Sequence, residues 1–112
     1  MSRHDGEWLS GIVDAIAAIR KYQQRGDISD GLIFDAIRLR LIEIGEAVKR
    51  IDPETLALEP DIPWGEIAGM SDRLAHRYFD TSHAIVQATI DNDLPELESG
   101  VKRLQSKADS SE

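Results

Sequence analysis

Residues 34–51, FDAIRLRLIEIGEAVKRI, carry the apolar spacing that decides the fold. Large apolar side chains recur here after three, four, three, four and three residues: Phe34, Ile37, Leu41, Ile44, Val48 and Ile51. Because an α-helix turns once every 3.6 residues, this spacing places the side chains in one stripe along a helix. The segment therefore predicts a long amphipathic helix that ends by Asp52, since Pro53 disfavours helical geometry in the residue before it.

The residues before this segment predict a first helix over residues 6–24. Its apolar stripe consists of Trp8, Ile12, Ile16 and Ile19. Gly26 suits a left-handed residue at the end of this helix, and either Asp27 or Ser29 suits the start of the next one. The two helices are thus predicted to be joined by a short loop.

A third helix is predicted after a proline-containing connector over residues 52–63, which includes one short turn near residues 54–58. Pro63 suits the first turn of that helix, where a backbone N–H is not needed. Its stripe recurs after three, four, three and four residues: Trp64, Ile67, Ser71, Leu74 and Tyr78. Ser71 has a small side chain, whereas the other members of this stripe are large. Gly45 in the second helix suggests a close approach between helices, although a tolerated small residue explains it equally well.

The C-terminal third of the chain predicts two more helices. Asp80 or Thr81 suits the N-cap of a helix that runs through Ala88. Residues 91–93 mark a break, and Pro95 suits the first turn of the last helix. His83 has no charged neighbours in the sequence and is expected to lie on the surface or in packing.

Four or five helices with short connections favour an all-α, antiparallel up-and-down bundle. The predicted domain covers residues 1–104, and residues 105–112 are predicted to form a polar, disordered tail. The stripe of residues 34–51 offers more apolar surface than one small bundle needs, so a homodimer is expected. Packing within one chain explains the same stripe.

Composition narrows the classes of function. The 112 residues are 41% hydrophobic and 30% charged, which is typical of one globular domain. The absence of cysteine excludes disulfides, thiolate nucleophiles and zinc sites built on sulfur. No segment has the length of a membrane span, and a cytoplasmic protein is expected. The net charge of −8 argues against sequence-indifferent nucleic-acid binding, so any RNA contact must be local.

Residues 70–78, MSDRLAHRY, gather the groups best suited to chemistry. On a helix, Arg73, His76 and Arg77 share one face because they lie three and four residues apart. Guanidinium groups match phosphate oxygens, and an imidazole exchanges a proton near neutral pH. Asp72, four residues before His76, could orient its ring. The alternative is ordinary: a histidine flanked by arginines is commonly a solvated surface residue.

Several separated motifs give the chain a resemblance to a known family. They are residues 44–47 (IGEA), 62–67 (IPWGEI), 69–79 (GMSDRLAHRYF) and 92–95 (NDLP). Together they resemble the HepT-like ribonuclease toxins of the HEPN superfamily. The resemblance implies a four- to five-helix homodimer that cleaves RNA in a cleft on the dimer axis, with no metal ion or cofactor. It also implies a toxin-antitoxin pair in which an MNT-type nucleotidyltransferase antitoxin adenylylates a tyrosine.

The family motif is an arginine, four to six residues, a histidine, one residue and a tyrosine. By this resemblance the histidine is His76 and the tyrosine is Tyr78, the expected RNA contact and adenylylation acceptor. The chain departs at the arginine, because its natural position is Ser71. Arg73 is one helical turn before His76 and is the expected partial substitute, with Arg77 as a second phosphate stabiliser. Tyr78 has a structural alternative as the end of its apolar stripe.

The chemistry can also be argued from the residues. Attack by an RNA 2′-hydroxyl needs a base, an acid for the leaving 5′-oxygen, and positive charge near the phosphate. A two-fold axis would bring two copies of His76 to one cleft. Three hypotheses follow. The protein is a HepT-like RNase toxin, or a non-catalytic relative that has Ser71 in place of the motif arginine but still binds the nucleotidyltransferase. The third hypothesis is a helical interaction protein with no nucleic-acid role.

Overall fold

The segment 34–51 forms most of helix α2 (Gly31–Arg50) in a computed structural model of the chain. The structure describes the backbone of residues 2–76 and 79–110, and the side chains of residues 2–76 and 83–107. The other elements are α1 (Arg3–Arg25), α3 (Pro53–Leu56), α4 (Trp64–His76), α5 (Phe79–Ala88), the π-helical turn η1 (Thr89–Asp93) and α6 (Leu94–Ser110). No strand occurs within these described ranges, and the predicted all-α bundle is confirmed.

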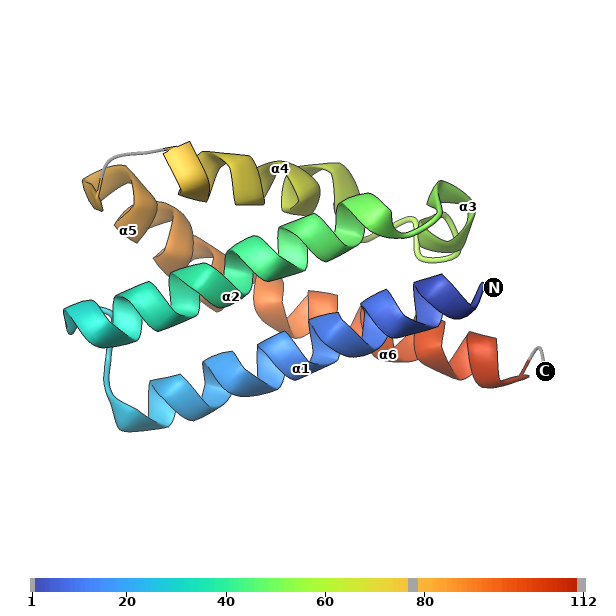
Figure 1. The fold of residues 1–112 in the computed structure, drawn as a ribbon, viewed down its shortest axis with the longest axis horizontal. Helices are drawn as coiled ribbons and strands as arrows, with labels where there is room; N and C mark the ends of the chain where they lie inside the picture. The colour runs from blue at the N-terminus through green and yellow to red at the C-terminus, as the bar shows by residue number, and fades with distance from the viewer. Residues whose placement is uncertain (1, 77–78, 111–112) are drawn as a thin grey trace.

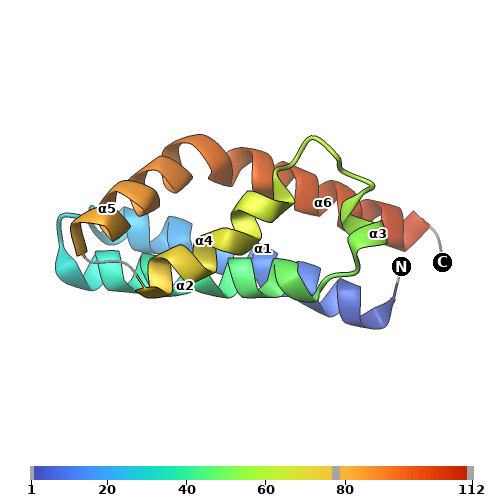
Figure 2. The same ribbon diagram turned by 90° about the horizontal axis from the view of Figure 1, so that it is seen from above.

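Helix α2 lies between α1 and α4 and is the centre of the bundle (Figure 1). Helices α5 and α6 form one bent run, in which the start of α5 lies beside the start of α2 and α6 lies across the molecule from α2 (Figure 2). The predicted apolar stripe of α2 is buried along its whole length, since none of its six side chains is more than 3% exposed. The stripe is therefore filled by packing within one chain, as the second interpretation of its spacing held.

The loop between α1 and α2 differs in detail from the prediction. Asp30, and neither Asp27 nor Ser29, is the N-cap of α2, because its carboxylate accepts hydrogen bonds from the first backbone N–H groups of the helix. Asp27 instead accepts a bond from the Ser29 N–H at 2.6 Å and closes the turn before it. Gly26 does end α1, but its φ of 172° is extended backbone, so the predicted left-handed conformation is wrong.

The predicted break at residues 91–93 is replaced by a continuous helical run. The turn η1 joins α5 to α6, and the Leu94 N–H bonds to the carbonyl of Thr89, five residues back. The physical reason is Pro95, which has no N–H to offer the carbonyl of Asp91, so the regular α-helical ladder is interrupted at this point. Helix α6 then continues to Ser110, beyond the expected start of the tail at residue 105.

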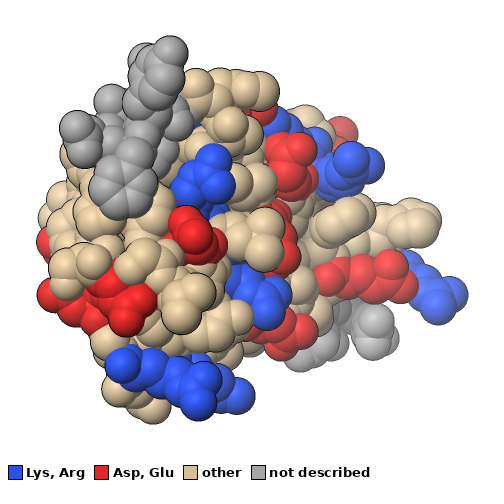
Figure 3. Space-filling model, turned by 60° about the vertical axis from the view of Figure 1, so that its left-hand side comes forward, with Lys and Arg blue, Asp and Glu red and all other residues tan. Residues whose placement is uncertain are grey.

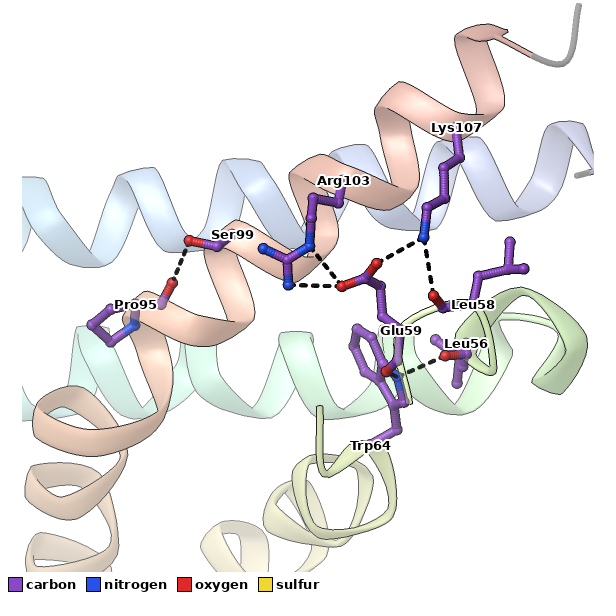
Figure 4. Close-up of polar contacts among 8 residues, drawn as sticks. All are labelled: Leu56, Leu58, Glu59, Trp64, Pro95, Ser99, Arg103 and Lys107. Carbon is purple, nitrogen blue, oxygen red and sulfur yellow. Dashed lines mark hydrogen bonds and ion pairs between the residues drawn. The ribbon is translucent and has the colours of Figure 1, made fainter. Parts of the chain in front are cut away.

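The connector before α4 is tied to α6 by one carboxylate (Figure 4). Glu59 binds Arg103 at 2.7 Å and Lys107 at 2.8 Å. The indole Nε1 of Trp64 donates to the carbonyls of Leu56 and Glu59 at 2.9 and 3.0 Å. These contacts set where α4 begins, and with it the position of the segment that carries His76.

Helices α2 and α4 approach closely at Gly45, as the sequence suggested. A Cβ atom built on Gly45 would lie 2.7 Å from the Cβ of Ser71 and 3.0 Å from the carbonyl oxygen of Ile67. No other residue type fits between these atoms without moving the helices apart. The structure also has, among its described residues, no helix long and apolar enough to cross a membrane.

Candidate functional site

Helix α4 carries the candidate site, and His76 is its last residue. The imidazole of His76 is exposed, so it is open to a substrate from solvent. Arg77 and Tyr78, the other residues predicted at this end of α4, lie outside the described residues. The other histidine of this half of the chain, His83, stacks on Phe34 with ring centroids 4.2 Å apart, which agrees with packing, one of the two alternatives expected for it.

Ser71, which the sequence predicts at the position of the motif arginine, is buried, with 2% of its surface exposed. Its hydroxyl donates to Oε2 of Glu46 at 2.8 Å and approaches the carbonyl of Ala68 at 3.0 Å. Its Cβ packs against Gly45. Ser71 therefore serves the contact between α2 and α4, and it presents no cation toward the end of α4.

A small polar network extends this contact. The ammonium of Lys49 lies 2.6 Å from Oε2 of Glu46 and 3.0 Å from Oδ1 of Asp72. The hydrogen bonds that Lys49 donates to Glu46 and then to Asp72 raise the pKa of Lys49, and the bonds that Glu46 accepts from Lys49 and then from Ser71 lower the pKa of Glu46. Asp72, the predicted orienter of His76, is thus placed in an ion pair with α2.

Arg73 does not point to His76. Its Nη2 donates to the carbonyl of Glu66 at 3.4 Å, so the side chain runs back toward the start of α4. Side chains on a helix lean toward its N-terminus, which accounts for this direction. The guanidinium lines a small hollow between α4 and η1 together with Glu66 and Asp93. Burial, followed by the charges of Glu66 and Glu96, raises the pKa of Asp93 there.

One residue near the end of α4 was missed by sequence reasoning. Arg38, on α2, donates a hydrogen bond from Nη2 to the carbonyl of Leu74 and is half-buried. Leu74 lies in the same final turn of α4 as His76. The available signal was the place of Arg38 beside Ile37 of the apolar stripe, which puts it near the helix that packs on α2.

The surface at this end of the bundle mixes charges of both signs. Figure 3 turns the end of the molecule where α2 begins and α4 ends toward the viewer, and basic and acidic side chains alternate on it. Within the described part of the chain, no group of three His, Asp or Glu side chains is placed to hold a metal ion. Among the described side chains, the site therefore offers the exposed imidazole of His76 and the guanidinium of Arg38, which lies beside the same helix turn.

A comparison with models of known protein families shows to which family this chain belongs. The family model described as "Ribonuclease HepT-like" matches residues 12–104. The chain belongs to the HepT-like family. The match covers α2 to α5 completely and most of α1 and α6, and it confirms the resemblance drawn from the separated motifs.

Two curated relatives show how far the similarity to HepT-like proteins extends. "Putative RNase TTE0752" of Caldanaerobacter subterraneus subsp. tengcongensis is 40% identical over 80 residues, which is 71% of this chain and 71% of the relative. "Probable ribonuclease HepT" of Thermococcus cleftensis is 31% identical over 109 residues, which is 94% of this chain and 99% of the relative. No solved structure gives a significant match.

Proposed function

We propose that this HepT-like protein is an endoribonuclease that cleaves RNA without a metal ion, with His76 as its acid-base group. The observation that carries the proposal is an exposed His76 at the end of α4, the residue predicted to be the histidine of the family motif. The relatives described above are named as ribonucleases, which supports RNA as the substrate. Histidine is suited to the step because its ordinary pKa allows it to accept and return a proton near neutral pH.

The proposed reaction is attack of an RNA 2′-hydroxyl on the adjacent phosphorus. The hydroxyl proton goes to a neutral imidazole, the bond from phosphorus to the 5′-oxygen breaks, and that oxygen takes a proton from an imidazolium. One histidine cannot be base and acid in the same step. We therefore place two copies of His76 in one cleft, on the two-fold axis of a homodimer.

The outer face of α2 supports such a dimer. Leu32 and Leu39 are 81% and 55% exposed, and they lie two helical turns apart on one side of the helix. Exposed leucines in a row are unusual on a surface that otherwise carries charge, and a second subunit would cover them. The same face lies along the half of α2 that carries Arg38, next to the end of α4.

Regulation is proposed to act on Tyr78. In a toxin-antitoxin pair, an MNT-type nucleotidyltransferase antitoxin would transfer AMP to the phenol oxygen of Tyr78. The added phosphate places a bulky anion two residues from His76, where it repels the RNA backbone and fills the space of the substrate. Incubation of the purified pair with ATP should then add the mass of one AMP to wild-type protein and none to Tyr78→Phe.

A second candidate function has a specific observation in its favour. Ser71 is buried against Gly45 and bonded to Glu46, so the motif cation is missing from its usual position. Loss of one charge-stabilising group commonly costs about 10² to 10³ in rate. The chain would then be a disarmed HepT-like protein that keeps its dimer and its contact with the nucleotidyltransferase.

One experiment separates the two candidates. The purified protein, free of any antitoxin and unmodified at Tyr78, is incubated with labelled RNA in the presence of EDTA. The ribonuclease proposal expects cleavage that His76→Ala abolishes and that His4→Ala, an exposed histidine on α1, leaves unchanged. RNA that stays intact at high protein concentration would instead favour the disarmed relative.

A further inference from the structure

We propose that Arg38 supplies the guanidinium that holds the scissile phosphate beside His76, in place of the absent motif arginine. This inference rests on the proposed ribonuclease function. It assigns the phosphate contact to α2, a helix that carries no part of the sequence motif. Four observations on the described side chains lead to it.

The first observation is the position of Arg38. Its Nη2 donates to the carbonyl of Leu74, two residues before His76. A cation at the C-terminal end of a helix is favoured by the helix dipole. The contact fixes the guanidinium at the turn of α4 that carries His76.

The second observation is that two other cations whose side chains are described, Lys49 and Arg73, are engaged elsewhere. Lys49 lies between the carboxylates of Glu46 and Asp72, and this group of three carries a net negative charge. Arg73 reaches back to the carbonyl of Glu66, toward the opposite end of α4. Neither is placed to meet a phosphate at His76 without breaking these contacts.

The third observation concerns the ion-pair and hydrogen-bond partners of Arg38. Among the described side chains, Arg38 forms no ion pair with a carboxylate, and the Leu74 carbonyl is its hydrogen-bond acceptor. A guanidinium has five N–H donors in a planar fork, so several remain for the oxygens of a phosphate. Because no described carboxylate offsets its positive charge, it can stabilise the added negative charge of the transition state.

The fourth observation is the partial burial of Arg38. A half-buried side chain held at one nitrogen loses little further freedom when it binds a phosphate. Its interaction with an anion is also less screened by water than that of an extended surface arginine. Arg38 transfers no proton and forms no covalent bond; its role is to bind the non-bridging oxygens while His76 moves the protons.

The test compares three variants of α2. Arg38→Gln keeps a neutral donor for the Leu74 carbonyl but removes the charge, and Arg38→Lys keeps the charge but loses the planar fork. The matched control is Arg40→Gln, two residues along the same helix, where the guanidinium instead contacts Glu43 and Tyr22. We expect Arg38→Gln to lower kcat/KM for RNA by about 10² to 10³, Arg38→Lys to recover part of the loss, and Arg40→Gln to stay within a few-fold of wild type.

RNA binding gives a second readout that a purely structural role would not change. In a His76→Ala background, adding Arg38→Gln should reduce the salt dependence of single-stranded RNA binding by about 0.7 in the slope of log K against log salt. If Arg38→Gln cleaves and binds RNA like Arg40→Gln, the inference is overturned while the ribonuclease proposal stands. If wild-type protein cleaves nothing, the ribonuclease proposal fails by itself. The binding slope then decides separately whether Arg38 contacts a phosphate.

Discussion

At the scale of single residues, the contact between Gly45 and Ser71 links helix packing to the side chains available at the candidate site. Gly45 lets α2 and α4 approach until the Cβ of Ser71 fills the space above it. The serine hydroxyl then reaches Glu46, which also holds Lys49. The position predicted for the motif arginine is thus part of a helix contact in this chain.

Substitution Gly45→Ala is expected to destabilise the protein. The new methyl group would meet the Ser71 Cβ at 2.7 Å and the backbone oxygen of Ile67 at 3.0 Å, and a backbone atom cannot move aside cheaply. Overpacking of about 1–3 kcal/mol should exceed the gain of about 1 kcal/mol in helix propensity. Urea unfolding measures the difference, and Gly11→Ala, with nothing within 4 Å, is the control expected to stabilise.

Substitution Ser71→Arg is expected to raise RNA cleavage. The Cβ of residue 71 already fits against α2, and the longer side chain can extend past Glu46, whose side chain is half exposed. A second guanidinium beside the cleft should increase the rate by about 10². Growth of cells that express the variant and cleavage of labelled RNA both report the change. An inert Ser71→Arg protein that folds normally would count against both a cleft at this position and the disarmed-relative hypothesis.

At the scale of elements, the connector 57–63 and the turn η1 determine how α4 is held. The connector is fastened to α6 by Glu59, which binds two cations on successive turns of that helix. The turn η1 bends the run from α5 to α6, so α5 contacts the first part of α2 while α6 contacts α1. Neither feature carries the motif, yet both decide where its helix lies.

The contact of Glu59 predicts a stability that depends on pH. The hydrogen bonds from Lys107 and then Arg103 lower the pKa of Glu59 below its ordinary value of 4.5. The stabilisation is therefore complete above that value and is lost as the pH falls through the folded-state pKa. Glu59→Gln should unfold at lower urea concentration than wild type at pH 7, and the gap should narrow below pH of about 4. Glu7→Gln, which breaks an exposed pair with Arg3, is the control expected to show little change.

At the scale of the whole molecule, an acidic chain with a net charge of −8 is proposed to act on a polyanion. The overall field repels RNA, so binding must depend on cations close to the bound phosphate. A homodimer would double the local groups at the two-fold axis while the rest of the surface stays acidic. The exposed leucines on α2 are the surface that we assign to this contact.

Substitution Leu39→Glu is expected to give a monomer with little activity. A charge on each side of the two-fold axis would face its own copy, and burial of both would be costly. Separation of the two His76 groups should lower cleavage by about 10² or more. Light scattering measures the mass in solution. Leu58→Glu, at a comparably exposed leucine on the connector, should leave both mass and activity unchanged. A dimeric, active Leu39→Glu protein would refute this interface.

The sequence by itself determined most of the helices, the buried stripe of α2 and the family, and it offered the close approach at Gly45 as one of two interpretations. These features follow from local spacing, because helical periodicity and motif order are properties of continuous segments. Only the tertiary structure decided that Ser71 faces Glu46, that Arg73 turns back to Glu66 and that Arg38 reaches the last turn of α4. These contacts depend on how helices distant in sequence pack and on which way each side chain leans, and no spacing within one segment records either.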